Sequence, residues 1–567
     1  MTSIAAAETK TQPSDSSADN ITTTGTCCLS GLRAPSDVDH LVLLPGSDGI
    51  DYSVTKQMLD KYSRQLYVYG IAAMSRMMNS SVLVSGMSGT GIEIAKNVIL
   101  AGVKSFTVHD TVDTTHMDLA SQFFLEESDV GKNRAEVCVT KLKELNKLTP
   151  VTLSTEPLEC TKSSVGKYTV VVLVDYHQDR LNEISRYCHE NDIIFLATGC
   201  YGLYGYAFSD FGKNHTITDT DGSMPLSGLV IGVERQTGED VAPGTFKMLT
   251  EEKESHGLSD DDQIVFSGIE EGTIWNKILE GKTFPIKRMN KTLKKKDPET
   301  GEIKETPTKS TDFQAFQVCV DISGLSEDQN VALQSAHYDG SSFYYNQHKA
   351  PVVISHLPFE EAIIQPDKTS NLLYEYIDFR LPQKLHCYLL SLWEYQRHHN
   401  GELPVSGSME GAKEIVNDAI KRMKEQHGMN DMEKEEEENT RNRLETLCLG
   451  ARGRLNPMAT IFGGVVGQEV MKGCSGKYTP LNQMFHFEDV NCSPPKLTEE
   501  EATPRGNRYD GMIATMGQTF VDNIRDTKVF LVGSGALGCE FMKNFAMCGV
   551  GTNVKDGGGN GVTGECS

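Results

Sequence analysis

One internal duplication constrains the fold of this 567-residue chain more than any other feature. Residues 81–103 align without gaps to residues 528–550, and eight of the 23 aligned pairs are identical. Those pairs are Val82/Val529, Gly86/Gly533, Gly91/Gly538, Glu93/Glu540, Lys96/Lys543, Asn97/Asn544, Gly102/Gly549 and Val103/Val550. Tyr62 and Tyr509 each precede the first glycine of their copy by 24 residues. Because chance does not keep such a register, the sequence predicts two related units in one chain.

Short apolar runs alternate with helical patterns around the first copy. We expect strands at 81–85, 103–109, 169–174 and 193–198, and helices at 90–101 and 132–145. Strands that alternate with helices form a parallel sheet covered on both faces. The first copy is therefore predicted to be an α/β, Rossmann-like unit.

The second copy carries a complete glycine-rich motif, Gly533-Ser534-Gly535-Ala536-Leu537-Gly538, after an expected strand at Val529–Val532. In such a motif the first glycine makes a tight turn, the second lets phosphates approach the backbone, and the third lets helix and strand pack. The helix N-terminus then favours an anion. The first copy has Ser88 in place of Gly535, so we interpret it as a degenerate, structural partner. A tight turn without a ligand remains the alternative for the second copy.

Two further polar residues accompany the duplication. Arg64 aligns with Gly511, so the cation occurs only in the copy that is not expected to bind nucleotide. If the two units pack about a pseudo-twofold axis, Arg64 could reach the partner's triphosphate, because a guanidinium offers several donors to phosphate oxygens. A surface arginine is the alternative. Asp110 ends the second strand, where a ribose-binding acid could lie, but the upstream Ser88 favours a structural role.

Composition and turn signals divide the chain into six segments. They are a disordered tail at 1–54, the first part of unit one at 55–200, a β-rich insertion at 201–330, a helical segment at 350–449, the last part of unit one at 450–495, and the start of unit two at 500–567. The net charge of −24 argues against a nucleic-acid partner. No apolar run approaches the roughly 20 residues of a membrane span. The 14 cysteines lack metal-site spacing, so we expect no metal ligands and a reducing compartment.

Several blocks of sequence resemble a known family. They are YSRQLYVYG (62–70), GIEIAKNVILAGVKSFTVHD (91–110), NPMATIFGGVVGQEVMKGCSGKY (456–478), NRYDG (507–511) and VFLVGSGALGCEFMKNFA (529–546). Together they are similar to the single-chain ubiquitin-activating enzymes. The resemblance implies a Rossmann-like adenylation fold of the ThiF type. It also implies that an inactive adenylation domain carries a first catalytic-cysteine half-domain at 201–330 and a four-helix bundle at 350–449, and is followed by an active copy.

The resemblance further implies ATP and Mg²⁺ as cofactors. ATP would adenylate the C-terminus of ubiquitin or a ubiquitin-like modifier, and a cysteine would then capture the acyl group as a thioester. Gly533, Gly535, Ala536 and Gly538 would contact the nucleotide, and Arg64 would be the cross-domain arginine. The implied partners of the full-length protein are the modifier and ubiquitin-conjugating enzymes, in the cytoplasm and nucleus.

The sequence departs from the family after Gly551. The family continues with a strand, further nucleotide ligands and a catalytic-cysteine domain, whereas here a glycine-rich stretch precedes Ser567. We therefore expect no catalytic cysteine, an inactive chain, and a truncated or mis-spliced gene. Neither Asp556 nor Cys566 is assigned a catalytic or ribose role, and Cys448 and Cys474 are expected in the core.

Two alternatives to the enzyme remain open. The chain could be a non-catalytic module that binds ubiquitin or a partner. It could also be a nicotinamide- or flavin-dependent oxidoreductase that uses residues 533–538, although the degraded first copy disfavours that reading.

Overall fold

The computed structural model describes residues 41–45, 51–236, 238, 241–251, 256–296, 303–335, 342–364, 370–371, 380–494 and 497–553. The chain divides into two compact units, residues 1–75 and 76–567. Asp556 and Cys566 lie outside the described residues. Among the described residues, no helix combines the length and the apolar character that crossing a bilayer requires.

The first compact unit contains a β-hairpin and the helices that follow it. Strand β1 (Leu41–Pro45) pairs antiparallel with β2 (Asp51–Thr55) over five residue pairs. Helix α1 (Lys56–Tyr69) comes next, followed by α2 (Ile71–Met78), which crosses the unit boundary. The prediction of a disordered tail over 1–54 is therefore wrong for residues 41–45 and 51–54, because two short runs of β-favouring residues pair with each other.

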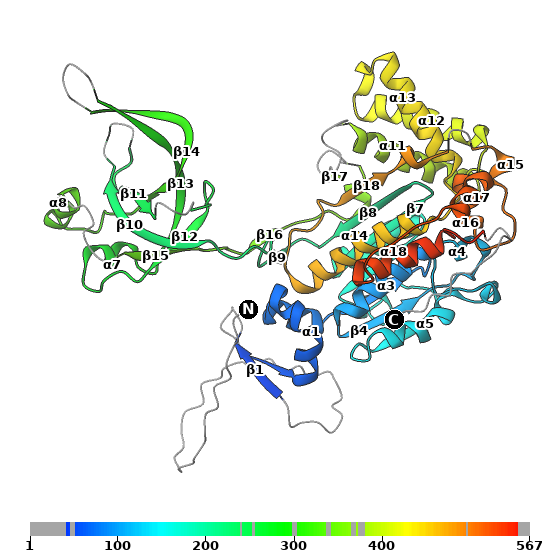
Figure 1. Ribbon diagram of the computed structural model, residues 1–567, viewed down its shortest axis with the longest axis horizontal. Coiled ribbons are helices and arrows are strands. Elements are labelled where there is room, and N and C mark those ends of the chain that lie inside the picture. Colours follow the sequence, from blue (N-terminus) through cyan, green and yellow to red (C-terminus); the bar gives the residue numbers. More distant parts are fainter. Residues whose placement is uncertain are drawn as a thin grey trace, which may run out of the picture. The chain divides into compact units, whose positions relative to one another are not determined.

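A twisted sheet of eight strands forms the centre of the second unit (Figure 1). Its strands are β3 (Ser81–Ser85), β4 (Ser105–His109), β5 (Val151–Ser154), β6 (Val170–Val174), β7 (Ile194–Tyr201), β8 (Tyr204–Asp210), β17 (Ser370–Asn371) and β18 (Met484–Glu488). The helices that pack against it or join its strands are α3 (Gly89–Ala101), α4 (His116–Leu119), α5 (Arg134–Leu145), α6 (Gln178–Glu190) and α14 (Asn456–Ser475). The predicted α/β class is confirmed.

The strand order β17-β18-β8-β7-β6-β3-β4-β5 contains a parallel segment from β5 to β7. Within that segment the chain first moves outward from β3 to β5 and then returns to β6 on the other side. This is the doubly wound order in which ligands bind where the direction reverses. The loop after β3 lies at that switch point. Strand β6, Val170–Val174, is buried along its whole length, as expected for a strand covered on both faces.

A closed six-stranded barrel is inserted after β8. Its strands are β10 (Ser227–Arg235), β11 (Thr245–Thr250), β12 (Gln263–Ser267), β13 (Thr283–Lys296), β14 (Ile303–Cys319) and β15 (Phe343–Gln347), and it also carries α7 (Ile274–Leu279) and α8 (Glu327–Ser335). Large side chains such as Phe246, Phe266 and Trp275 fill it. Two antiparallel strands, β9 (His215–Ile217) and β16 (Val352–Ile354), lead into and out of it.

The barrel bounds differ from the predicted β-rich segment at 201–330. Residue 201 ends β7, which turns directly into β8 of the large sheet, and the barrel continues to Gln347. The difference arises because a β-hairpin of a mixed sheet and a barrel strand have the same period-two pattern. Helices α9 (Phe359–Ala362), α11 (Leu381–His398), α12 (Met409–Gln426) and α13 (Lys434–Leu449) follow the barrel.

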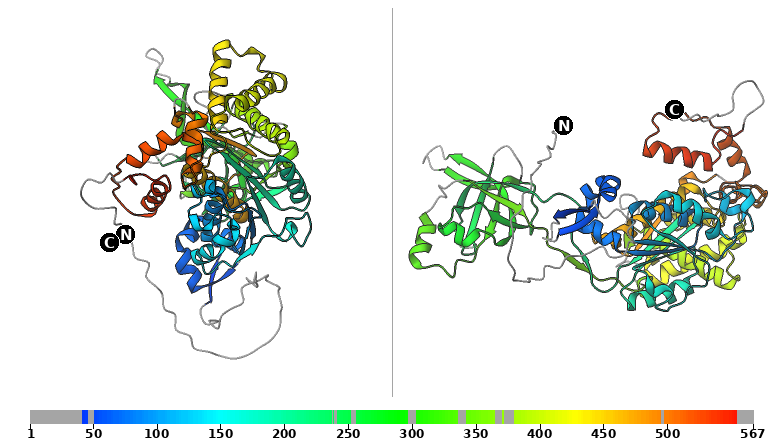
Figure 2. Two further views of the ribbon diagram at one scale, coloured as in Figure 1. Left: turned by 90° about the vertical axis from the view of Figure 1, so that its right-hand side faces the viewer. Right: turned by 90° about the horizontal axis from the view of Figure 1, so that it is seen from below.

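The second copy of the duplication is shorter. It begins after α15 (Glu499–Ala502) and comprises α16 (Asp510–Met516), α17 (Gln518–Asp526) and α18 (Ala536–Met547), drawn in orange and red in Figure 2. The strand expected at Val529–Val532 does not form. In the first copy β3 pairs with both β4 and β6, whereas no described strand pairs with 529–532, and an unpaired strand has no hydrogen-bond ladder. Phe530 is 90% exposed as a result.

Buried histidines near β9 and β16 predict a pH dependence of stability. The Phe211 N–H donates to Nδ1 of His356 over 3.1 Å, and burial, with His215 and His189 nearby, lowers the pKa of His356 to about 4. Between pH 6.5 and about 4 the unfolded chain therefore binds a proton that the folded chain refuses. We expect the free energy of unfolding to fall by about 2–3 kcal/mol as pH decreases through this window.

Urea unfolding at pH 7 and pH 5 measures this effect. His356→Asn should flatten the dependence, because the amide oxygen replaces Nδ1 as an acceptor and does not titrate. The exposed His348 provides the control, and His348→Asn should leave the slope unchanged. Equal slopes in the wild type and His356→Asn would contradict the assignment.

Candidate functional site

The two glycine-rich loops have the same backbone conformation. Gly86 and Gly533, the first glycines, have φ angles of +96° and +95°, a region that L-residues with side chains rarely adopt. A Cβ at Gly91 would lie 1.8 Å from the carbonyl oxygen of Gly86, and one at Gly538 would lie 2.1 Å from that of Gly533. The first and third glycines are therefore required by the turn itself in both copies.

The second glycine differs between the copies. Gly535 is the N-cap of α18 with φ −69° and ψ −168°, and Ser88 is the N-cap of α3 with φ −67° and ψ −176°. Both pairs of φ and ψ angles are allowed for any residue. A Cβ at Gly535 would meet no atom of the described chain within 4 Å. Because the first copy accommodates Ser88 in the same conformation, the fold does not demand a glycine at 535. Because Gly535 has no side chain, the N-terminus of α18 is open to a ligand.

The corresponding loop of the first copy is closed by its own chain. Ser88 is buried at 3% exposure, and a Cβ at Gly89 would lie 2.5 Å from Oγ of Ser121. The carboxylate of Asp110 accepts hydrogen bonds from the Met87 N–H at 2.6 Å and from Arg134 Nε at 2.9 Å. Asp110 therefore fixes the loop and is paired with a buried guanidinium, which supports its expected structural role.

Reciprocal ion pairs join α3 to α18. Lys543 Nζ binds the Glu93 carboxylate, and Lys96 Nζ lies 2.8 Å from Oε1 of Glu540. Glu93 aligns with Glu540, and Lys96 aligns with Lys543. In each ion pair, the glutamate of one copy therefore binds the lysine of the other copy, and the two pairs are equivalent. Such an exchange is the mark of an isologous interface, here between two homologous halves of one chain. The pseudo-twofold packing considered from the sequence is therefore present between these two helices.

Lys96 is held charged by this arrangement. Burial opposes the charge of Lys96, but hydrogen bonds and charge attraction from Glu540 and Glu93 outweigh it, and the pKa of Lys96 is raised. Burial would raise the pKa of Glu540, yet Lys543 and Lys96 together lower it. Both lysine ammonium groups also face the ring of Phe123, at 5.9 and 4.8 Å.

Helix α14 lies beside α3 and α18 and makes contacts with both (Figure 1). A Cβ at Gly463 would lie 2.3 Å from Cβ of Glu93, so this glycine permits the close approach of α14 to α3. Asn97 Nδ2 donates to the Gly463 carbonyl at 3.1 Å, and its counterpart Asn544 accepts from Asn456 at 2.5 Å. The identical residues of the duplication thus form a continuous interface.

Comparisons with known proteins show the family to which both copies belong. The ThiF family matches residues 62–505 and 509–554, which cover both copies and the inserted segments. The chain belongs to the ThiF family. It is 36% identical over 496 residues to "Ubiquitin-activating enzyme E1 1" of Triticum aestivum, covering 87% of this chain and 42% of that protein. It is also 36% identical over 496 residues to "Ubiquitin-like modifier-activating enzyme 1" of Mus musculus, covering 86% and 42%.

Helix α16 of the second ThiF copy packs against the first copy. By sequence it belongs to the second copy, yet it packs on α4 of the first. A Cβ at Gly511 would lie 2.7 Å from Cβ of Ala120 and 2.7 Å from the Met117 carbonyl oxygen. Gly511 aligns with Arg64, so the segment of one copy reaches the other copy's loop region.

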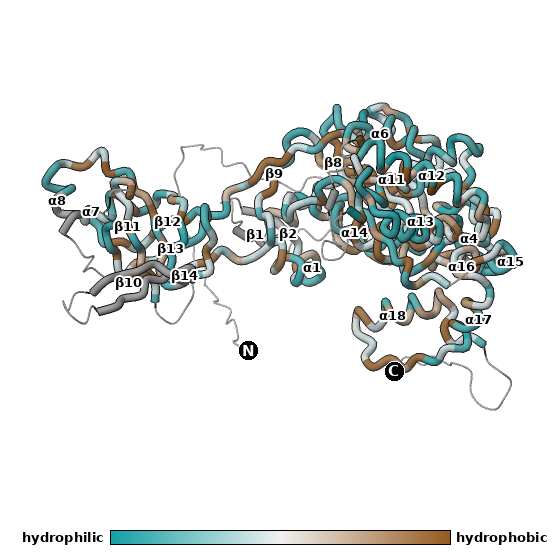
Figure 3. The backbone as a smooth tube through the Cα atoms, turned by 90° about the horizontal axis from the view of Figure 1, so that it is seen from above, coloured by the Kyte–Doolittle hydropathy of each residue, from teal (hydrophilic) through white to brown (hydrophobic). Residues whose placement is uncertain are grey.

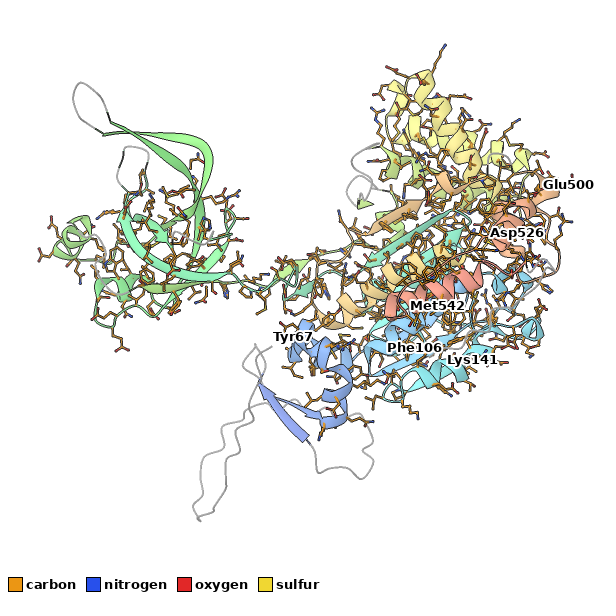
Figure 4. All side chains as sticks on the ribbon, viewed as in Figure 1. Tyr67, Phe106, Lys141, Glu500, Asp526 and Met542 are labelled. Atoms are coloured by element: carbon orange, nitrogen blue, oxygen red, sulfur yellow. The ribbon has the colours of Figure 1, made fainter. Side chains whose placement is uncertain are left out.

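Arg64 itself lies on α1, in the first compact unit, and its side chain is exposed. Its cross-domain role stays a prediction. Tyr67, labelled in Figure 4, is 92% exposed on the same helix. Gly533, Gly535, Ala536 and Gly538 occupy the turn and first residues of α18, and their nucleotide contacts likewise stay predictions.

The interface role of Glu93, Lys96, Glu540 and Lys543 was not predicted from the sequence. The signal was available, because identical charged residues at equivalent places in two degenerate copies indicate a shared contact. Among the described residues, no group of three or more His, Cys, Asp or Glu side chains could hold a metal ion. Cys448 and Cys474 are buried as predicted, and burial raises the pKa of Cys474 to about 12.

Proposed function

We propose that this ThiF chain provides the nucleotide loop and the inactive partner of a ubiquitin-activating enzyme. In this reaction ATP adenylates the C-terminal carboxylate of ubiquitin or a ubiquitin-like modifier, and a cysteine then captures the acyl group. The single observation that carries the proposal is Gly535, which the fold does not require and which leaves the N-terminus of α18 bare. Phosphate oxygens would accept from the free N–H groups there.

The names of the relatives support the choice of reaction. They are called ubiquitin-activating or ubiquitin-like modifier-activating enzymes, and the chain spans about two fifths of their length. The activity, the modifier and the ubiquitin-conjugating partners of the whole protein are therefore part of the proposal. The alternative is a non-catalytic ubiquitin- or partner-binding fragment.

The loop at 533–538 suits a nucleotide, whereas the described side chains offer no ligand set for Mg²⁺. Gly533, Gly535, Ala536 and Gly538 would hold the phosphates through their backbone, and Arg64 would be the cross-domain arginine that the sequence suggests. When bound, ATP would supply the adenylyl group that activates the modifier's carboxylate, with pyrophosphate as the leaving group. The described residues offer no metal cluster, so we assign none of them to Mg²⁺. We place the protein in the cytoplasm and nucleus, where its free cysteines would stay reduced.

Ubiquitin-dependent ATP–pyrophosphate exchange tests the proposal. The assay should use the longest product that the gene expresses, with the 1–567 chain measured in parallel. We expect exchange only when ubiquitin or a related modifier is added. Binding of ubiquitin by both products without any exchange would favour the non-catalytic module instead.

A further inference from the structure

The second ThiF copy exposes a large apolar face that no described part of the chain covers. Residues 529–532 and one stripe of α18 form it, and Figure 3 shows hydrophobic residues, in brown, along both. Six large side chains are 41–90% exposed there: Val529, Phe530, Val532, Leu537, Phe541 and Met542. Together they present roughly 800 Å², which exceeds the largest apolar patch of a typical monomer and matches what each partner of a standard interface buries.

The equivalent positions of the first copy are core positions. Each of the six aligned residues is at most 2% exposed: Val82, Leu83, Ser85, Thr90, Ile94 and Ala95. In that copy β3 lies between β4 and β6, and α3 packs against it. At three positions the second copy has the larger or more apolar residue, namely Val532 for Ser85, Leu537 for Thr90 and Met542 for Ala95. A face that is more hydrophobic than its buried counterpart is suited to burial.

The backbone of 529–532 lacks partners as well. Among the described residues, no strand pairs with this segment, and its N–H and C=O groups make no hydrogen bond. A stretch of unpaired backbone groups is a template for pairing with another chain. Because the same four residues carry apolar side chains, addition of a strand would satisfy the backbone and bury the side chains together.

A second copy of this chain fits both features. Two identical segments paired antiparallel are related by a twofold axis, so the interface closes at the dimer. The six exposed residues include no charged side chain, so two copies with a net charge of −24 each can meet there without like charges in contact. Glu540 and Lys543 lie on the face of α18 that packs on α3, where they are already ion-paired.

We propose that residues 529–532 and α18 form the interface of a homodimer of this chain. The two 529–532 segments pair antiparallel, with Val529 of one copy opposite Val532 of the other. The side chains of Phe530, Leu537 and Phe541 are buried between the two copies. The ion-paired contact of α18 with α3 stays in place, because it uses another face of the helix. This dimer does not depend on nucleotide binding.

Sedimentation velocity of the whole 1–567 chain over a range of concentrations tests the dimer. We expect the mass to rise from one chain to two as the concentration increases and then to stay at two, because a twofold interface closes. Hydrogen exchange of the same samples should show the amides of 529–532 slowed only where the dimer forms. A chain that stays monomeric at every concentration, or that forms larger species without stopping at two, would overturn the proposal.

Two lysine variants locate the interface. Phe530→Lys should weaken the dimer at least about tenfold, because it removes a central aromatic ring and places two ammonium groups in one interface. Phe530 is 90% exposed, so the monomer should keep its fold. Met224→Lys, at an 84% exposed position before β10, makes the same change of charge elsewhere and should leave the association unchanged.

Two results would contradict this assignment of the face. Equal weakening by the two lysine variants would mean that net charge, and not the apolar face, controls the association. Slow exchange of the 529–532 amides in a monomer would mean that another part of the same chain covers the face.

Discussion

In the longest product that the gene expresses, Gly535→Val is expected to reduce ubiquitin-dependent ATP–pyrophosphate exchange by a factor of about 10²–10³, because blocking access to a backbone N–H has the effect of losing one transition-state hydrogen-bond donor. A branched side chain at the N-cap of α18 would occupy the space through which phosphate oxygens reach the backbone. The extended conformation at 535 suits valine, and no described atom lies within 4 Å of the new Cβ. The free energy of unfolding of the ligand-free chain should therefore fall by no more than about 1 kcal/mol, the usual cost of replacing a favourable N-cap residue.

The first copy provides the matched control for this variant. Ser88→Ala changes the equivalent position of the degenerate loop and should leave exchange unchanged. Gly535→Ala should give an intermediate loss. If Gly535→Val retained full activity, then the bare backbone at 535 would have no catalytic meaning and the nucleotide assignment would fail.

Glu93→Gln is expected to loosen the interface between the two ThiF copies by about 3–5 kcal/mol. The Glu93 side chain is 1% exposed and binds both Lys96 and Lys543. Removing its charge leaves both ammonium groups paired only with the 45% exposed carboxylate of Glu540, so the cost should lie at the lower end of that range. Hydrogen exchange of α18 measures this, because undocking of residues 536–547 exposes their amides.

The homologous position again supplies the control. Glu540 makes the reciprocal ion pair, but its side chain is 45% exposed, so solvent replaces much of what the pair contributes. Glu540→Gln should cost less than about 1 kcal/mol. Met542, labelled in Figure 4, lies on the same helix and is 41% exposed. Equal acceleration of exchange in the two variants would mean that burial does not decide the strength of this interface.

Local patterns in the sequence predicted the local elements well. Strand β3 and helix α3 follow directly from an apolar run and a glycine-rich turn. The strand expected at 529–532 has the same pattern, yet it does not form, because strand formation depends on neighbours far away in sequence. Figure 3 shows hydrophobic residues, in brown, along this segment and α18. A hydrophobic pattern alone indicates a tendency to form a strand. Pairing with a neighbouring strand decides whether the strand forms.

The candidate site was predictable in part for a related reason. Alignment of the copies identified Gly535 and Ser88 as the informative pair. It could not show that Gly535 is free of internal steric demands, because that depends on which atoms surround its Cβ. The exchange of α16 between copies also depends on contacts such as Gly511 with Ala120, which no local pattern records.

The exchanged helix decides where the polypeptide can be divided for expression. Thr515 of α16 donates to the Gly450 carbonyl at 3.3 Å, and a Cβ at Gly453 would lie 1.7 Å from its hydroxyl oxygen. A fragment that ended near residue 505 would lack Thr515 and would expose Gly450 and Gly453. One that ended near residue 517 would keep them covered. The better C-terminal boundary for an expressed fragment therefore lies inside the second repeat, several residues beyond the boundary that homology alone would suggest.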